Sequence, residues 1–146
     1  VPINACPDYN GAAPLTLNTT ATTGTLSVTP SEIDQVLASP DSSLAFVTYS
    51  AAAGAGVLPY YTPSASAGAF GSLGTVQLSS GAQAPLAGIF SPDGSIFFTS
   101  TSGDNLVHMV DTTSLTDTGT INPKLTDGSG NPLPPIFLAV QSRSTT

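Results

Sequence analysis

The chain has 146 residues, of which 40% are hydrophobic and 8% are charged, and nine carboxylates against two cations give it a formal net charge of -7 at pH 7. This hydrophobic content is sufficient for the core of one globular domain. The negative charge repels phosphate backbones and anionic headgroups, which argues against nucleic-acid binding and electrostatic membrane binding. No apolar run approaches the roughly 20 residues needed to insert into a bilayer.

Neutral hydroxyl groups take the place of charges on the surface, since 39 residues are Ser or Thr. Salt and pH affect such groups little, whereas surface ion pairs are screened and titrate. We therefore expect a secreted or cell-surface protein.

Residues 1–30 predict an extended arm, or a strand that completes a neighbouring sheet, because turn residues interrupt them. Cys6 is the single cysteine, so it is either a small buried side chain or a link to a second chain. Asn18 begins the sole N-x-Ser/Thr sequon and is a candidate glycosylation site. Because the chain begins at Val1, we expect any export signal to have been removed or never attached.

Short β-rich runs dominate the rest of the chain, and only residues 31–37 could form a helical turn. Turn residues separate these runs at the spacing of an all-β architecture. The predicted strands are Thr25–Val28, Gln35–Ala38, Leu44–Tyr49, Val57–Tyr61, Gly74–Leu78, Leu86–Phe90, Ile96–Thr101, Leu106–Val110, Gly119–Ile121 and Ile136–Gln141.

One motif occurs twice, 52 residues apart, over residues 39–48 and 91–100. Each copy begins with Ser-Pro-Asp and continues into a β-branched and aromatic strand. Proline presets φ for the first turn position and aspartate caps the turn, so each copy predicts a hairpin. Recurrence at this period is typical of blades or solenoid turns.

Residues 50–72 predict an insertion between the two copies, since they are rich in Ala, Gly and Ser and carry no charge. The default interpretation is a flexible loop, although segments this small can also pack closely against a neighbouring subunit.

The second copy runs without a gap from Ser91 to Thr112, including Ser91-Pro92-Asp93-Gly94 and Val107-His108-Met109-Val110-Asp111-Thr112. It resembles the YVTN family of β-propeller repeats, whose blades read approximately SPDG-x-x-x-YVTN-x-x-x-N-x-V-x-VID-T. The first copy matches through Phe46-Val47-Thr48-Tyr49. The resemblance implies antiparallel four-stranded blades in an extracytoplasmic protein, such as a surface-layer protein or a lactonase-like propeller.

The fold class predicted is therefore all-β, with about two four-stranded blades over residues 31–146, the last strand closing a ring or terminating a stack. A closed propeller needs about 4–8 blades, so two would leave sheet edges and apolar faces without partners. We expect a homo-oligomer or polymer, formed as a ring or a filament. A fragment of a longer propeller and a self-contained β-sandwich remain alternatives.

Asp127, Ser129 and Asn131 form the candidate metal site, because oxygen-bearing side chains alternate around glycines as in loops that wrap calcium. The later bidentate glutamate of an EF-hand is missing, and a glycine-rich turn explains the pattern equally well. No other cofactor is expected.

Catalytic residues are not predicted. His108 is the only histidine, and it shares a predicted strand face with Leu106 and Val110; Asp104 and Asp111 are near it in sequence without a clear placement. A structural or surface role is expected for it.

Tyr60 and Tyr61 form a candidate ligand or interface pair, either a platform for sugar rings or part of a core or interface. The sequence as a whole predicts a non-enzymatic, extracellular structural or adhesive protein that self-assembles through strand edges. The alternatives are part of a lactonase-like enzyme and a carbohydrate-binding module with glycan partners.

Overall fold

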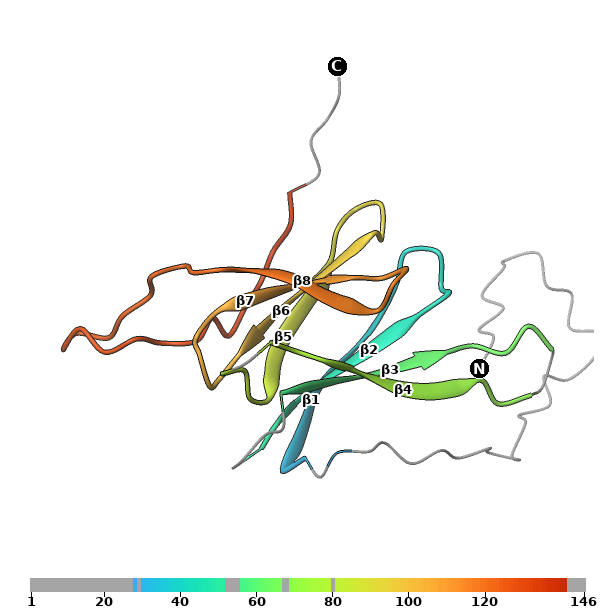
Figure 1. The fold of residues 1–146 in the computed structure, drawn as a ribbon, viewed down its shortest axis with the longest axis horizontal. Coiled ribbons are helices and arrows are strands. Elements are labelled where there is room, and N and C mark those ends of the chain that lie inside the picture. The colour runs from blue at the N-terminus through green and yellow to red at the C-terminus, as the bar shows by residue number, and fades with distance from the viewer. Residues whose placement is uncertain (1–27, 29, 52–55, 67–68, 80, 142–146) are drawn as a thin grey trace, which may run out of the picture.

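Two antiparallel four-stranded sheets make up the computed structural model, which describes residues 28, 30–51, 56–66, 69–79 and 81–141 (Figure 1). In both sheets every strand pairs with its neighbour in the chain, as in propeller blades, and no strand crosses to the other sheet as in an immunoglobulin-type sandwich. The predicted fold class is therefore confirmed. The first sheet comprises β1 (Glu32–Ala38), β2 (Ala45–Ser50), β3 (Val57–Thr62) and β4 (Ser72–Gln77), and the second comprises β5 (Pro85–Phe90), β6 (Ile96–Thr101), β7 (Val107–Asp111) and β8 (Thr116–Ile121).

The repeated Ser-Pro-Asp motif forms the same turn in both sheets, between β1 and β2 and between β5 and β6. In the first copy Asp41 Oδ1 accepts hydrogen bonds from the Ser39 hydroxyl at 2.6 Å and the Ser43 N–H at 3.1 Å, and in the second Asp93 Oδ1 accepts the equivalent bonds at 2.6 and 3.1 Å. Ser42 and Gly94 occupy the position of positive φ, at 62° and 75°. Both predicted hairpins are thus present.

The hydroxyl of Ser39 and two hydrogen bonds from Ser43 lower the pKa of Asp41 to about 2. Hydrogen bonds from Ser91 and Ser95 lower the pKa of Asp93 in the same way. The hydrogen bonds of both carboxylates come from serines of their own turns.

The hydrophobic core lies between the sheets and is centred on Phe46 of β2, whose ring stacks on that of Phe97 of β6 at a centroid distance of 4.4 Å. Phe90 of β5 contacts both rings. Gly88 makes this packing possible, since a Cβ there would lie 2.2 Å from Phe97 Cζ. The remaining buried core residues are Leu44, Leu58, Val76, Leu78 and Val110.

The two sheets contact each other at two places. β5 packs against β1 and β2, and β4 packs against β8. In the described part of the chain no helix is long and apolar enough to cross a membrane.

Three sequence expectations differ from the structure. Residues 32–38 form strand β1 and not a helical turn, because they pair along their length with β2. The segment 50–72 is not a loop insertion throughout, because it contains β3, which confirms the strand predicted at Val57–Tyr61, and the start of β4. The predicted arm 1–30, with Cys6 and Asn18, lies almost wholly outside the described residues.

The predicted closing strand Ile136–Gln141 is the third difference, because these residues form no strand. The segment lies along β5 instead: Ile136 and Phe137 share a surface hollow with Leu86, and Val140 shares another with Ile89. No backbone hydrogen bond joins residues 134–141 to another described residue, so proximity to β5 does not produce a ladder.

Candidate functional site

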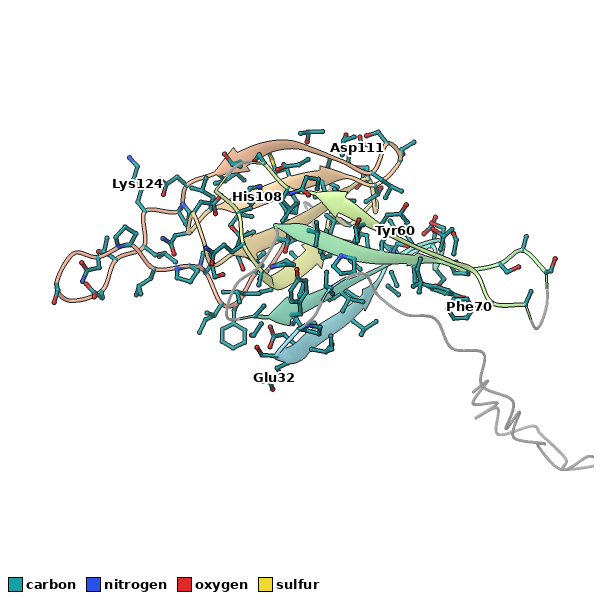
Figure 2. The ribbon with its side chains drawn as sticks, turned by 60° about the horizontal axis from the view of Figure 1, so that its bottom comes forward. Glu32, Tyr60, Phe70, His108, Asp111 and Lys124 are labelled. Carbon is teal, nitrogen blue, oxygen red and sulfur yellow. The ribbon has the colours of Figure 1, made fainter. Side chains whose placement is uncertain are left out.

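His108 of β7 is the most highly organised polar side chain between the sheets (Figure 2). It is completely buried, and both ring nitrogens contact carboxylates: Nδ1 lies 2.7 Å from Asp117 Oδ2, and Nε2 lies 3.0 Å from Asp104 Oδ2. Asp104 belongs to the β6–β7 turn and Asp117 to β8. The three side chains form what we call the histidine clamp.

Further donors hold the two carboxylates in place. Asp104 Oδ1 accepts hydrogen bonds from the Thr101 hydroxyl and from the Leu106 N–H. Asp117 Oδ2 accepts one from the Ser79 N–H at 2.9 Å. Because Ser79 follows β4, this last bond connects the first sheet to the second.

Opposing effects set the carboxyl pKa values of the clamp. Burial raises the pKa of Asp104, but the hydrogen bonds from Thr101, Leu106 and His108 outweigh it and hold that pKa below its ordinary value. Burial also raises the pKa of Asp117, and the hydrogen bonds from His108 and Ser79 again leave it lowered. Both residues therefore favour the carboxylate form.

The clamp does not have the arrangement of a Ser-His-Asp nucleophile. In such a triad the serine and the aspartate occupy different ring nitrogens. Here the Ser79 hydroxyl, 3.3 Å from Nδ1, shares that nitrogen with Asp117, which is closer. His108 is also closed to solvent, so the geometry favours the structural role expected from the sequence.

Asp111, which is close to His108 in sequence, lies apart from His108 in Figure 2 and caps the turn after β7. Its Oδ1 accepts hydrogen bonds from the Thr113 and Ser114 N–H groups at 3.0 and 2.7 Å. Sequence reasoning missed Asp117 and Ser79 as partners of His108. The strand ladder alone would not have found Asp117, because Asp117 pairs with Val110 and His108 pairs with Thr120.

The candidate metal residues Asp127, Ser129 and Asn131 do lie in one turn, at the end of a bridge between Thr126 and Pro132. Asp127 Oδ1 accepts hydrogen bonds from the backbone N–H groups of Ser129 and Asn131, and its Oδ2 accepts one from the Asn131 amide. These donors, the Asn131 amide first, lower the pKa of Asp127. N–H groups thus occupy the positions from which a cation would approach, and the turn interpretation explains the motif without calcium.

The candidate pair Tyr60 and Tyr61 point to opposite faces of β3, as neighbouring residues in a strand must. Tyr60 packs edge-on against Phe46 at 6.3 Å, within the core between the sheets. Tyr61 lies 5.3 Å from Phe70 at the β3–β4 hairpin, and its hydroxyl accepts a hydrogen bond from the Gly71 N–H. The two rings therefore do not form one flat platform.

Comparison with solved structures finds similarity to part of U3-55K, a WD40 β-propeller protein. The match has a TM-score of 0.46 and 14% sequence identity, and it covers 62% of this chain and 26% of that chain. No protein-family model and no curated protein matches the sequence. The description of two blade-like units therefore rests on their strand order and register.

Proposed function

We propose that this chain is a non-enzymatic structural or adhesive protein of the cell exterior, which joins copies of itself through the edges of its sheets into a ring or a filament. The observation that carries the proposal is the pair of open four-stranded sheets. In the described part of the chain β1, β4, β5 and β8 each have a strand partner on one side only. Unpaired edges template association with further strands.

The composition supports an exterior location, since a hydroxyl-rich, weakly charged surface tolerates changing salt and pH. The repeated Ser-Pro-Asp turn and its strand further support a relationship to YVTN-type blades, which we include in the proposal. Two units are fewer than the 4–8 blades of a closed ring, so several copies would be needed to close one.

The two other candidate functions have less support. A lactonase-like reaction would need an accessible base, and His108 is buried and held on both sides. A sugar-binding platform made of both rings would need them to be coplanar, and Tyr60 and Tyr61 point to opposite faces of β3.

Measurement of the native mass tests the proposal directly. We expect sedimentation velocity and negative-stain microscopy to show rings or filaments, and not particles of the 14.6 kDa chain alone. A monodisperse monomer that stays soluble at high concentration would contradict the proposal.

Lysine substitutions test the role of the edges. Thr75 on β4 and Thr120 on β8 are exposed residues of edge strands. A charged side chain there disfavours edge pairing, so Thr75→Lys and Thr120→Lys should shorten or dissolve the assemblies. Thr113→Lys, in the turn after β7, is the matched control and should leave them intact.

A further inference from the structure

The two sheets are related by the 52-residue repeat. This relation shows which face of the second sheet corresponds to the buried face of the first. Phe46 of the first sheet points into the interface, where it stacks on Phe97. Its repeat equivalent is Phe98, which neighbours Phe97 in β6 and so points to the opposite, outer face of the second sheet. The outer face of the second sheet is therefore the counterpart of the buried face of the first.

Other residues follow the same relation. Ile89, the equivalent of the core residue Leu37, pairs with Phe98, and Phe98 pairs with Met109. Ile89, Phe98 and Met109 form an apolar row that is only half-buried. We call it the outer row.

Two buried hydroxyls without hydrogen-bond partners also lie at equivalent positions of the repeat. Thr48 Oγ1 and Ser100 Oγ are buried side-chain atoms without a hydrogen-bond partner, and they occupy equivalent positions. Thr48 faces the interface between the sheets, alongside Phe46, whereas Ser100 lies on the outer face beside Ala87. This independent pair supports the equivalence of the two faces.

The outer face of the first sheet carries exposed apolar residues and small residues, which complement the outer row. Val36 and Ile33 of β1 lie there, 69% and 45% exposed. Ala38 and Ala45, paired on the same face, are the repeat equivalents of Phe90 and Phe97. Small residues thus stand where the internal interface has aromatic rings, which leaves room for a large side chain from a partner.

From this correspondence we propose that the outer row receives the outer face of the first sheet of a second copy, in a head-to-tail contact that repeats the internal packing of the two sheets. The inference rests on the proposed self-assembly. It adds a contact between sheet faces of two copies to the contact between their strand edges.

The internal contact assigns a register to this interface. The Gly88 N–H donates a hydrogen bond to Gln35 Oε1 across the two sheets, at 3.1 Å. The repeat equivalents of Gly88 and Gln35 are Val36 and Ala87, so Ala87 of one copy lies against Val36 of the next. Ala87 is only 3% exposed and residues 136–140 lie along β5, so this register requires that the segment move aside on docking.

A charged side chain on the outer face of the first sheet tests the contact, and we expect it to leave the fold intact. Val36→Glu changes a side chain that is 69% exposed, and Leu125→Glu is the matched control, at an apolar residue 47% exposed outside both faces. Sedimentation should show that Val36→Glu weakens self-association by about tenfold or more, while the control stays within about twofold of the unmodified chain. Circular dichroism confirms that both variants are folded.

Cross-linking tests the register. In a Cys6→Ser background, mixed Val36→Cys and Ala87→Cys chains should form a disulfide-linked dimer under mild oxidation, and mixed Val36→Cys and Leu125→Cys chains should not. Equal linkage in both mixtures would overturn the register.

The outcomes separate this inference from the proposed function. If the chain assembles and the edge lysines dissolve it while Val36→Glu has no effect, the self-assembly stands and the face contact is wrong. If the unmodified chain never assembles, both are wrong.

Discussion

Individual side chains of the histidine clamp connect four elements at one point. His108 comes from β7, its carboxylate partners come from β8 and a turn, and Ser79 follows β4 of the other sheet. Carboxylates that are largely buried are sensitive to the loss of a hydrogen-bond partner, because they keep their desolvation cost. Removing one side chain of the clamp should therefore destabilise the fold through the buried groups that remain.

We predict that His108→Ala lowers the free energy of unfolding by about 3–5 kcal/mol, because Asp104 and Asp117 stay largely buried and lose the ring that lies between them. Urea denaturation followed by circular dichroism measures the change. Adding Asp104→Asn and Asp117→Asn to His108→Ala should restore part of the loss, since the uncompensated charges are removed. A single variant as stable as the original chain would show that the clamp contributes little.

Acid should destabilise the fold, because several aspartates have lowered pKa values in the folded chain. Asp41, Asp93, Asp104 and Asp117 have folded pKa values below their ordinary values, so the unfolded chain binds protons more readily as the pH falls. Their contribution is present above about pH 4, the ordinary pKa of aspartate, and is lost as the pH falls through their lowered folded pKa values, which is about 2 for Asp41.

Urea midpoints measured from pH 5 to pH 2 test this prediction. Asp41→Asn should flatten the decline, because an amide does not titrate, whereas Asp34→Asn at an exposed position of β1 serves as the control. The same slope in all three chains would contradict the assignment of the decline to the turn carboxyls.

At the scale of elements, the sequence indicated most strands because turn chemistry and β-branched residues coincide in this chain. Both Ser-Pro-Asp turns could be predicted, since proline, aspartate and a positive-φ position act within a few residues. The segment 136–141 has the same strand-like composition and forms no strand, because a ladder also requires a partner edge in register. The clamp partners could not be located for a related reason: Ser79 is 29 residues from His108, so only the packing of the sheets brings them together.

Two glycines in strands should tolerate no side chain. A Cβ at Gly88 would lie 2.2 Å from Phe97 Cζ, and one at Gly74 would lie 2.4 Å from Tyr60 Cζ. Gly88→Ala and Gly74→Ala should each lower the free energy of unfolding by about 1–3 kcal/mol through overpacking. Gly128→Ala, where no atom lies within 4 Å of the added Cβ, should remain within about 0.5 kcal/mol in the same denaturation assay.

At the scale of the whole molecule, aromatic rings from four strands in two sheets join the units into one core. Phe46 contacts Tyr60 of its own sheet and Phe90 and Phe97 of the other. The sheets should therefore unfold together.

We predict that Phe46→Ala lowers the free energy of unfolding by about 3–5 kcal/mol while leaving a single transition. Far-UV circular dichroism and tyrosine fluorescence should give coincident midpoints before and after the substitution. Two separated transitions in the unmodified chain would show that the sheets are independent.

Each sheet is drawn from one uninterrupted stretch of chain, with residues 78–84 as the only covalent connection between them. A duplicated stretch of about fifty residues could enter at this connection without interrupting any ladder of backbone hydrogen bonds, although the Ser79 contact would have to form again with a new neighbour. The architecture is thus suited to growth by tandem duplication of its gene segment.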